Sequence, residues 1–240
     1  MTLRFRFHGE LNDFLPPPKR DAEFEQPAGP TDTLKHVIES IGVPHTEIGR
    51  VLVNEGVTDL STQAENLDRV AVFPFELPIR LNDARFVVDG HLGRLAAYLR
   101  MLGFDTWYER LADDLQLASI AGREQRFLLT RDVGLLKRRE VIQGYWVRSQ
   151  KPHVQLHEIS DRFALHSQFR PFQRCMECNG VLEPVAKTDV LDLLPPHTRE
   201  TKEEFSRCRQ CGKVFWRGSH HAQMLVWIER LQVPPNDLCV

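Results

Sequence analysis

Four of the five cysteines fall into two Cys-x-x-Cys pairs in the last third of the chain. Each pair can form a tight turn that points two thiolates at one centre, and four thiolates around a tetrahedral centre suit Zn²⁺. Asn179 and Gly212 supply the small turn residue that such a turn requires after its second cysteine. We predict a closed, structural zinc site whose ligands are Cys175, Cys178, Cys208 and Cys211.

Two alternatives to the zinc site remain open. The four cysteines could be unrelated free thiols, or one pair could act in redox chemistry, although no strand–helix–strand unit surrounds either pair. The fifth cysteine, Cys239, is predicted to be a free thiol near the C-terminus.

A second set of candidate residues is acidic. Asp89 directly follows the expected strand RFVV, Asp132 comes just after the expected strand RFLLT, and Asp113 and Asp114 begin an expected helix. In parallel α/β sheets, ligands gather at the carboxyl ends of the strands, so we expect these carboxylates to converge. Clustered carboxylates repel one another unless a cation is present, and hard oxygen ligands suit Mg²⁺ or Mn²⁺. Such a metal activates water and stabilises an attacked phosphate, as in many nucleases.

Each acid also has an ordinary structural interpretation. Asp113 or Asp114 could cap the helix that follows, where a carboxylate is favoured near the positive end of the helix dipole. Asp132 could begin a turn, and Asp89 could cap the next helix. Asp105 stands at the start of an expected strand, hence at the opposite edge, and is excluded from the set.

Basic residues accompany these acids. Arg131 precedes Asp132, Lys137–Arg139 follow it, and Arg94 and Arg100 belong to the helix after Asp89. They could hold phosphates beside the acidic centre, or they could form solvated helix faces.

The expected secondary structure indicates three parts. Residues 1–80 contain a strand in which Leu3, Phe5 and Phe7 share one face, a Pro-rich loop, a helix capped by Thr31 or Asp32, and two further strands. Residues 85–165 alternate strands with single helices, which predicts a parallel sheet with helices on both faces. Residues 171–218 hold the cysteine pairs and an insert or hairpin between them, and a final helix follows.

Composition limits the class of protein. A hydrophobic fraction of 42% and 27% charged residues predict a globular protein rather than a disordered one. A net charge of −2 does not support nucleic-acid binding, although a local basic face remains compatible with it. No apolar run is long enough to span a bilayer and the N-terminus lacks an apolar signal core, so we expect a cytoplasmic protein with no membrane partner.

Residues 1–80 resemble the β-grasp, ubiquitin-like sulfur carriers in the phrases GVPHTEIGRVLVNEGV and NLDRVAVFPF. Those carriers end in a free Gly-Gly tail, whereas this chain continues through FELPIRLND. The resemblance therefore implies a docking or structural role, with a protein partner for this domain, rather than sulfur transfer.

The rest of the chain resembles the Mut-seven C-terminal RNase domain family, a PIN-like nuclease fold with an appended zinc ribbon. The matching phrases are VVDGHLGRLAAYLRMLGFDTWY, ADDLQLASIA, FLLTRDVGLLKRR, the two cysteine pairs and FWRGSHHAQM, which contains His220. The resemblance implies a metal-dependent ribonuclease. By position, Asp89, Asp114 and Asp132 would bind the metal, with Asp113 beside them and Arg94 and Arg131 near the phosphate.

The combined prediction is a three-part α/β protein: a ubiquitin-like β-grasp domain at 1–80, a PIN-like three-layer domain with a parallel sheet at 84–168, and a four-cysteine zinc ribbon with a C-terminal helix at 169–240. Its predicted activity is the hydrolysis of RNA phosphodiester bonds at an acidic Mg²⁺ or Mn²⁺ site. The main alternative is an RNA-binding or assembly module that uses the ribbon and the basic residues without catalysis. A weaker alternative is a sulfur-transfer partner.

Overall fold

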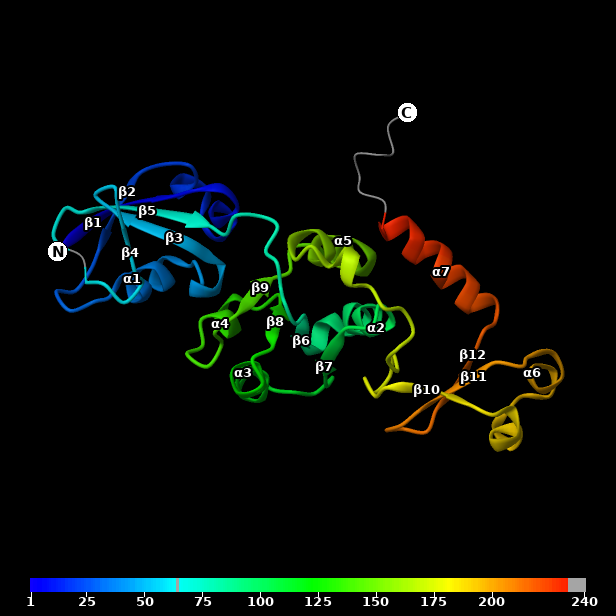
Figure 1. Ribbon diagram of the computed structural model, residues 1–240. Coiled ribbons are helices and arrows are strands. Elements are labelled where there is room, and N and C mark those ends of the chain that lie inside the picture. The colour runs from blue at the N-terminus through cyan, green and yellow to red at the C-terminus, as the bar shows by residue number, and fades with distance from the viewer. Residues whose placement is uncertain (64, 233–240) are drawn as a thin grey trace, which may run out of the picture. The chain divides into compact units, whose positions relative to one another are not determined.

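The computed structural model describes residues 1–63 and 65–232 of the 240-residue chain (Figure 1). The chain divides into two compact units. One unit comprises Met1–Ile79 and Leu111–Arg148, and the other comprises Arg80–Arg110 and Ser149–Val240. The region predicted as the nuclease domain, 84–168, thus contributes to both units, and the predicted domain boundaries stay predictions.

The N-terminal part of the first unit is a five-stranded sheet with strand order β2-β1-β5-β3-β4. β1 and β5 are parallel and the other neighbours are antiparallel. The helix α1 lies on one side of this sheet (Figure 1). The elements are β1 (Thr2–Phe7), β2 (Phe24–Pro27), α1 (Leu34–Ile41), β3 (Ile48–Val53), β4 (Gly56–Thr58) and β5 (Arg69–Pro74), with short 3₁₀ turns η1 (Gly9–Phe14), η2 (Pro17–Lys19) and η3 (His45–Glu47). This is the expected β-grasp arrangement.

The alternation predicted for the first strand explains the core of this domain. Leu3, Phe5 and Phe7 are almost completely buried, and they belong to a core that includes Leu34 and Ile38 of α1. The strand β2 is not predicted by the sequence pattern. The predicted helix cap at Thr31 or Asp32 is wrong, because the hydroxyl of Thr33 accepts the hydrogen bond from the His36 amide.

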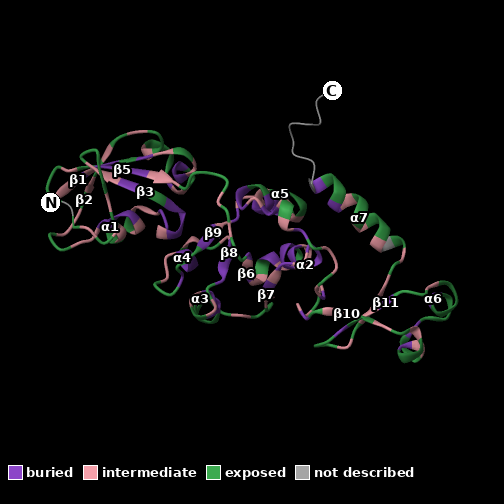
Figure 2. Ribbon diagram, in the orientation of Figure 1, coloured by how far each residue is buried: buried purple, intermediate pink, exposed green. Residues whose placement is uncertain are grey.

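The remainder of the first unit follows the predicted order of helices and strands. α3 (Asp114–Arg123) leads to β8 (Phe127–Thr130), α4 (Val133–Leu136) and β9 (Gly144–Trp146). β8 and β9 are parallel, with Leu128 opposite Gly144. All four residues of β8 are buried, as the continuous apolar run FLLT requires (Figure 2).

The second unit begins with another parallel pair of strands. β6 (Arg85–Val88) pairs with β7 (Asp105–Tyr108), and η4 (Gly90–Leu92) and α2 (Gly93–Met101) connect them. α5 (Pro152–Arg162) contacts α2, and the turn η5 (Leu165–Gln168) follows it. Two parallel pairs connected by single helices confirm the predicted α/β class.

The cysteine-rich region forms a three-stranded antiparallel sheet, β10 (Leu182–Val185), β11 (Phe205–Cys208) and β12 (Val214–Trp216). Between β10 and β11 lie η6 (Lys187–Asp189), η7 (Leu191–Leu193) and α6 (Pro196–Thr201). The predicted insert is thus a hairpin of β10 and β11 whose connection contains short helices. α7 (Ser219–Gln232) is the predicted final helix. Among the described helices, none has the length and apolarity that crossing a membrane would require.

Candidate metal centre and acidic residues

The two cysteine pairs come together in the second unit. Their four sulfur atoms all lie within 4.8 Å of one another. The Sγ atoms of Cys175 and Cys211 are 3.7 Å apart, and those of Cys178 and Cys208 are 3.3 Å apart. Zinc–sulfur bonds of about 2.3 Å in a tetrahedron place the sulfurs about 3.8 Å apart, so distances and donor type fit a zinc-type site.

Tight turns position the sulfurs as the residue types predict. Asn179 and Gly212 both have positive φ, +70° and +74°, which glycine adopts without strain and asparagine tolerates. The amide of Asn179 bonds to the Cys175 carbonyl, and the amide of Gly212 bonds to the Cys208 carbonyl. Gly180 is also required, because a Cβ atom there would lie 2.7 Å from the Cys208 sulfur.

The first cysteine turn is joined to α2 and β7 by residues that sequence analysis did not assign to it. Arg100 is 4% exposed and donates to the carbonyl oxygens of Thr106 at 2.9 Å, Glu177 at 2.6 Å and Met176 at 3.3 Å. Burial lowers the pKa of Arg100, and the nearby sulfurs of Cys178 and Cys175 oppose that shift. Arg100 is therefore a buried structural connection whose donors bind backbone carbonyl oxygens. In the sequence, the signal for this structural role is the position of Arg100 on the apolar face of its helix.

Asn179 makes the complementary connection to the start of β7. Its side-chain oxygen accepts from the Thr106 amide at 3.0 Å, and its side-chain nitrogen donates to Asp105 at 2.8 Å. Arg174 pairs with the same carboxylate at 3.5 Å. Asp105 thus has a structural role, consistent with its exclusion from the acidic set.

Asp89 directly follows β6 in the second unit and is 9% exposed. It precedes η4, but its side chain makes no capping hydrogen bond, so the helix-cap interpretation does not hold for it. The turn after it is tightly packed, since a Cβ at Gly90 would lie 2.6 Å from the Arg110 carbonyl oxygen. A Cβ at Gly93 would lie 2.5 Å from the Tyr108 hydroxyl. Arg94, the next residue, is exposed on α2.

The adjacent acids Asp113 and Asp114 have different positions in the first unit. Asp113 is the N-cap of α3, and its carboxylate accepts from the Gln116 amide at 2.8 Å. Asp114 is the first helical residue and is exposed. The capping alternative therefore applies to Asp113.

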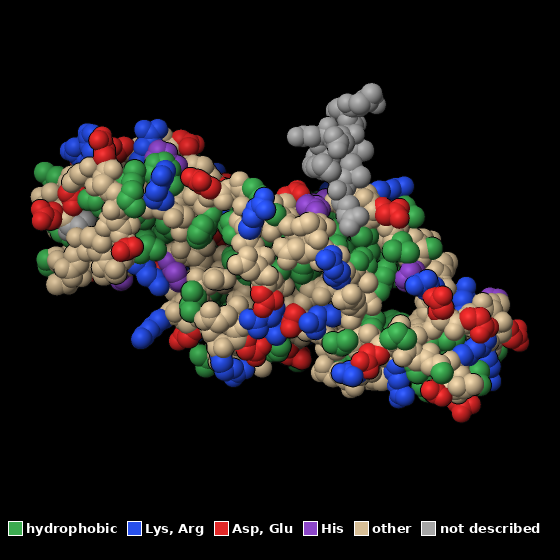
Figure 3. Space-filling model, in the orientation of Figure 1, with side chains coloured by type: hydrophobic (Ala, Val, Ile, Leu, Met, Phe, Trp, Pro, Cys, Tyr) green, Lys and Arg blue, Asp and Glu red, His purple; other side chains and the backbone are tan. Residues whose placement is uncertain are grey.

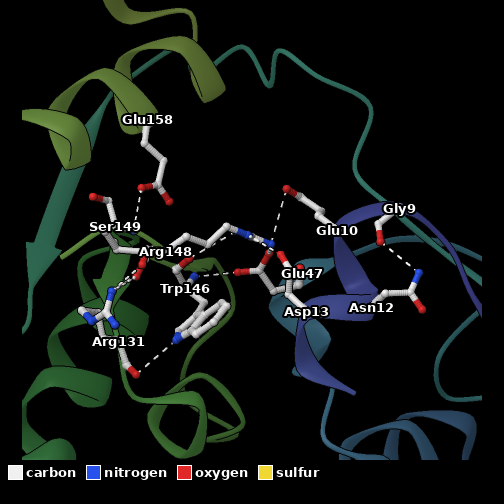
Figure 4. A network of polar contacts seen from close by, with 11 residues as sticks. Gly9, Glu10, Asn12, Asp13, Glu47, Arg131, Trp146, Arg148, Ser149 and Glu158 are labelled. Atoms are coloured by element: carbon white, nitrogen blue, oxygen red, sulfur yellow. Dashed lines mark hydrogen bonds and ion pairs between the residues drawn. The ribbon is translucent and has the colours of Figure 1, made fainter. Parts of the chain in front are cut away.

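Asp132 follows β8 and caps α4. Its Oδ1 accepts from the amides of Gly134 at 2.6 Å and Leu135 at 3.3 Å. Arg131 donates through Nη1 to the carbonyl oxygens of Val147 at 3.0 Å and Arg148 at 2.6 Å, which connects the ends of β8 and β9 (Figure 4). The side chain of Arg131, the residue before Asp132, thus already donates to backbone carbonyl oxygens.

Within the first unit, the β-grasp domain contacts the segment around β9 through a charged network (Figure 4). Arg148 approaches Asp13 at 3.0 Å, Glu10 at 3.4 Å and Glu47 at 3.8 Å. Burial lowers the pKa of Arg148, but Tyr145 and these carboxylates together raise it more, so the pKa lies above its usual value. The backbone amide of Trp146 also donates to Glu47 at 2.6 Å.

A second set of bonds ties the end of α1 to the segment after α4. Lys137 donates to the Glu39 carbonyl oxygen at 2.7 Å, so this member of the basic run binds the backbone at the end of α1. His45 lies 2.6 Å from the Glu39 carboxylate and 2.8 Å from the Val141 carbonyl oxygen. The β-grasp domain is thus attached by side chains that local sequence patterns do not identify.

Among the residues that the structure describes, the four cysteines are the one group of three or more His, Cys, Asp or Glu side chains with ligand atoms close enough to share a metal. The predicted acids are distributed between the two units, and their convergence stays a prediction. His220 lies in α7, where only its backbone is described, and Cys239 lies outside the described residues.

These features define a class: an α/β protein with parallel strand pairs, a four-thiolate zinc-type centre and an N-terminal β-grasp domain. Residues 84–228 match the family model described as the Mut7-C RNAse domain, and residues 1–80 match the one described as Mut7-C ubiquitin. The chain belongs to the Mut7-C RNAse domain family.

Comparison with solved structures finds SAMP1 from Haloferax volcanii, with 14% identity and a TM-score of 0.26. That match covers 31% of this chain and 94% of SAMP1. No curated protein matches the chain at a significant level.

Proposed function

We propose that the protein is a metal-dependent ribonuclease that hydrolyses RNA phosphodiester bonds. The observation that carries the proposal is the match of residues 84–228 to an RNase family, because this range contains Asp89, Asp114 and Asp132. Each of these acids stands just after a strand or at the start of a helix.

In this proposal the three carboxylates bind Mg²⁺ or Mn²⁺, which prefer oxygen ligands. The bound metal supplies activation of water and stabilisation of the attacked phosphate. Asp89 offers a carboxylate that caps no helix, and Asp132 is held in one orientation by two backbone amides. Asp113 serves as a cap that orients the first turn of α3 and thereby Asp114.

Two arginines have different proposed roles. Arg94 is exposed on α2 and is proposed to contact an RNA phosphate, where its fork of donors is favourable. Arg131 is proposed as a positioning residue, because its bonds to the carbonyls of Val147 and Arg148 hold the backbone next to Asp132.

The four cysteines are proposed to bind a structural Zn²⁺ ion. A set of four protein thiolates leaves no coordination position for water or substrate, so this ion supports the ribbon rather than the reaction. Cysteines that bind a metal rather than form disulfides are typical of a reducing compartment, and we propose the cytoplasm as the site of action. The ubiquitin-like domain is proposed to dock a partner rather than to carry sulfur.

The test is cleavage of a panel of labelled single-stranded and structured RNAs with Mg²⁺ or Mn²⁺. Asp89→Asn and Asp132→Asn remove charge while nearly preserving shape, and Asn also keeps the cap at position 132. Asp192→Asn, an exposed acid in the ribbon insert, is the matched control. Cleavage by the parent and the control, but by neither site variant, supports the proposal; equal cleavage by all four contradicts the acidic site.

One observation favours a second candidate, an RNA-binding module without catalysis. Asp113 and Asp132 both accept backbone hydrogen bonds at helix starts, a role that needs no metal. RNA binding without cleavage by the parent protein, in either metal, would support this candidate.

A further inference from the structure

The outer face of the β-grasp sheet, on the side away from α1, carries a group of arginines. Because side chains alternate along a strand, burial of Leu3, Phe5 and Phe7 places Arg4 and Arg6 on this face. Arg4 stands opposite Arg69 in the β1–β5 pairing. Arg50 stands opposite Phe73 in the β3–β5 pairing. Three adjacent strands thus contribute Arg4, Arg6, Arg50 and Arg69, which we call the arginine face.

The four residues of the arginine face outnumber the acidic side chains that pair with them or line the hollow beside them, Glu25, Glu23 and Glu55. Arg4 pairs with Glu25 at 3.5 Å, and this carboxylate is itself largely exposed. Arg6, Arg50 and Arg69 are exposed, and among the described residues neither Arg6 nor Arg69 has an ion pair. In Figure 3, Lys, Arg and His side chains gather over these strands, with acidic side chains among them.

An aromatic pair orients part of this face. The rings of His8 and Phe73 stack with centroids 4.1 Å apart and planes 5° from parallel. Arg50 lies over the Phe73 ring at 4.9 Å, which fixes the direction of its guanidinium. Burial and the neighbouring Arg6 both lower the pKa of His8, so a neutral imidazole is favoured.

A hollow adjoins the arginines. It has a volume of about 360 Å³ and is lined by the basic Arg4, Arg6 and Arg69, the acidic Glu23 and Glu55, and Leu52, Asn54, Val70 and Ala71. This volume is at the lower end of pockets that hold small ligands. Its aliphatic lining is limited to Leu52, Val70 and Ala71, whereas a protein docking site is expected to have a larger apolar core. Arginine forks match phosphate oxygens, so the chemistry of the hollow and its rim suits a nucleotide unit.

We propose that the arginine face binds the phosphodiester backbone of a single-stranded segment of RNA. The identification of RNA as the occupant rests on the proposed ribonuclease function. A surface that combines arginines with aromatic rings is typical of single-strand binding without strict sequence preference. The β-grasp domain then adds a substrate-binding surface to the chain outside the acidic residues.

The test is fluorescence anisotropy of a short labelled polyuridine with the full-length Asp89→Asn protein, so that cleavage does not obscure binding. The combined variant Arg6→Gln/Arg50→Gln is compared with Lys35→Gln/Lys151→Gln, which removes the same charge from the α1 side of the sheet and from the start of α5. Neutralising two phosphate contacts reduces the slope of log affinity against log salt by about 1.4. We expect affinity to fall about tenfold in the first variant and to stay constant in the second.

Arg6→Lys/Arg50→Lys keeps the charge and is expected to retain most of the affinity, which separates charge from folding. Three results would overturn the inference: equal losses of affinity in both Gln variants, unchanged affinity in Arg6→Gln/Arg50→Gln, or no binding by the Asp89→Asn protein itself. Displacement of polyuridine by polyglutamate as readily as by unlabelled polyuridine would also overturn it, in favour of an acidic protein partner. If the wild-type protein cleaves RNA while the Arg6→Gln/Arg50→Gln variant binds polyuridine normally, only this inference fails. If binding depends on these arginines but the wild-type protein never cleaves RNA, only the ribonuclease proposal fails.

Discussion

The guanidinium of Arg148 lies 3.8 Å from the carboxylate of Glu47, a side chain with no solvent exposure. Glu47 belongs to the β-grasp domain and Arg148 to the end of the β9 segment, so the pair connects parts of the first unit that are distant in sequence. A buried carboxylate without a cation is unfavourable.

Arg148→Met is therefore expected to lower the free energy of unfolding by about 3 kcal/mol, since it removes the Arg148 cation from the buried carboxylate of Glu47. Urea unfolding followed by tryptophan fluorescence measures the change, because Trp146 lies beside this network. Arg139→Met, an exposed arginine in the same unit, is the control and should shift stability by less than about 0.5 kcal/mol. Equal effects of the two substitutions would show that the Glu47 pairing is not the cause.

Removing one zinc ligand should release the metal. Cys208→Ser replaces a buried sulfur with a poorer zinc ligand, so zinc bound per chain, measured by plasma mass spectrometry, should fall to near zero. The ribbon should also become sensitive to proteolysis, because metal binding contributes folding free energy. Cys239→Ser, outside the described residues, is the matched control and should retain zinc. Retention of zinc by Cys208→Ser would contradict the four-thiolate assignment.

Arg100 should stabilise the second unit through the carbonyls it satisfies. Arg100→Met leaves the carbonyls of Thr106 and Glu177 without this donor, which should cost about 2 kcal/mol. Arg94→Met, an exposed position on the same helix, should change stability by less than about 0.5 kcal/mol. Thermal unfolding of the zinc-loaded proteins compares the two. Identical midpoints would mean that the bonds of Arg100 contribute nothing net.

Asp113 and Asp114 should separate in their effects on stability. Asp113→Ala removes the cap of α3 and should lower stability by about 1 kcal/mol, and Asp113→Ser should restore most of it. Asp114→Ala removes an equal charge from the first turn and should lower stability by only about 0.5 kcal/mol, through the helix dipole. Chemical denaturation checks the order, and a larger loss at Asp114 than at Asp113 would contradict the observed cap.

The β-grasp domain should not be activated as a sulfur carrier. A carrier presents the carboxylate of a free Gly-Gly tail, whereas this chain continues after β5 through residues 75–83. Incubation with a carrier-activating enzyme and ATP, followed by intact-mass spectrometry, should show no adduct. An adenylate or thiocarboxylate on this chain would revive the sulfur-transfer alternative.

Several features follow from local sequence patterns alone. Alternation of Leu3, Phe5 and Phe7 with arginines predicts both the buried and the exposed face of the first strand, because the side-chain period of a strand is two. Each Cys-x-x-Cys pair with its turn residue predicts a metal turn, because the ligands are only three residues apart. Helices and strands in the middle of the chain are likewise predicted by the period of their apolar residues.

Other features depend on residues that are distant in the chain. Arg100, Arg131 and Lys137 look alike as helix or strand-end cations, yet each donates to a backbone carbonyl of a particular other segment. A missed cap at Thr33 and the assignment of the cap of α3 to Asp113 rather than Asp114 are decided by single hydrogen bonds.

The sequence by itself thus determined most of the helices and strands and the grouping of the four cysteines, because these rest on short-range spacing, and its matching phrases indicated the family. Only the tertiary structure decided which charges are structural. Burial and hydrogen-bond partners depend on contacts such as Arg148 with Glu47, between residues that no local period relates.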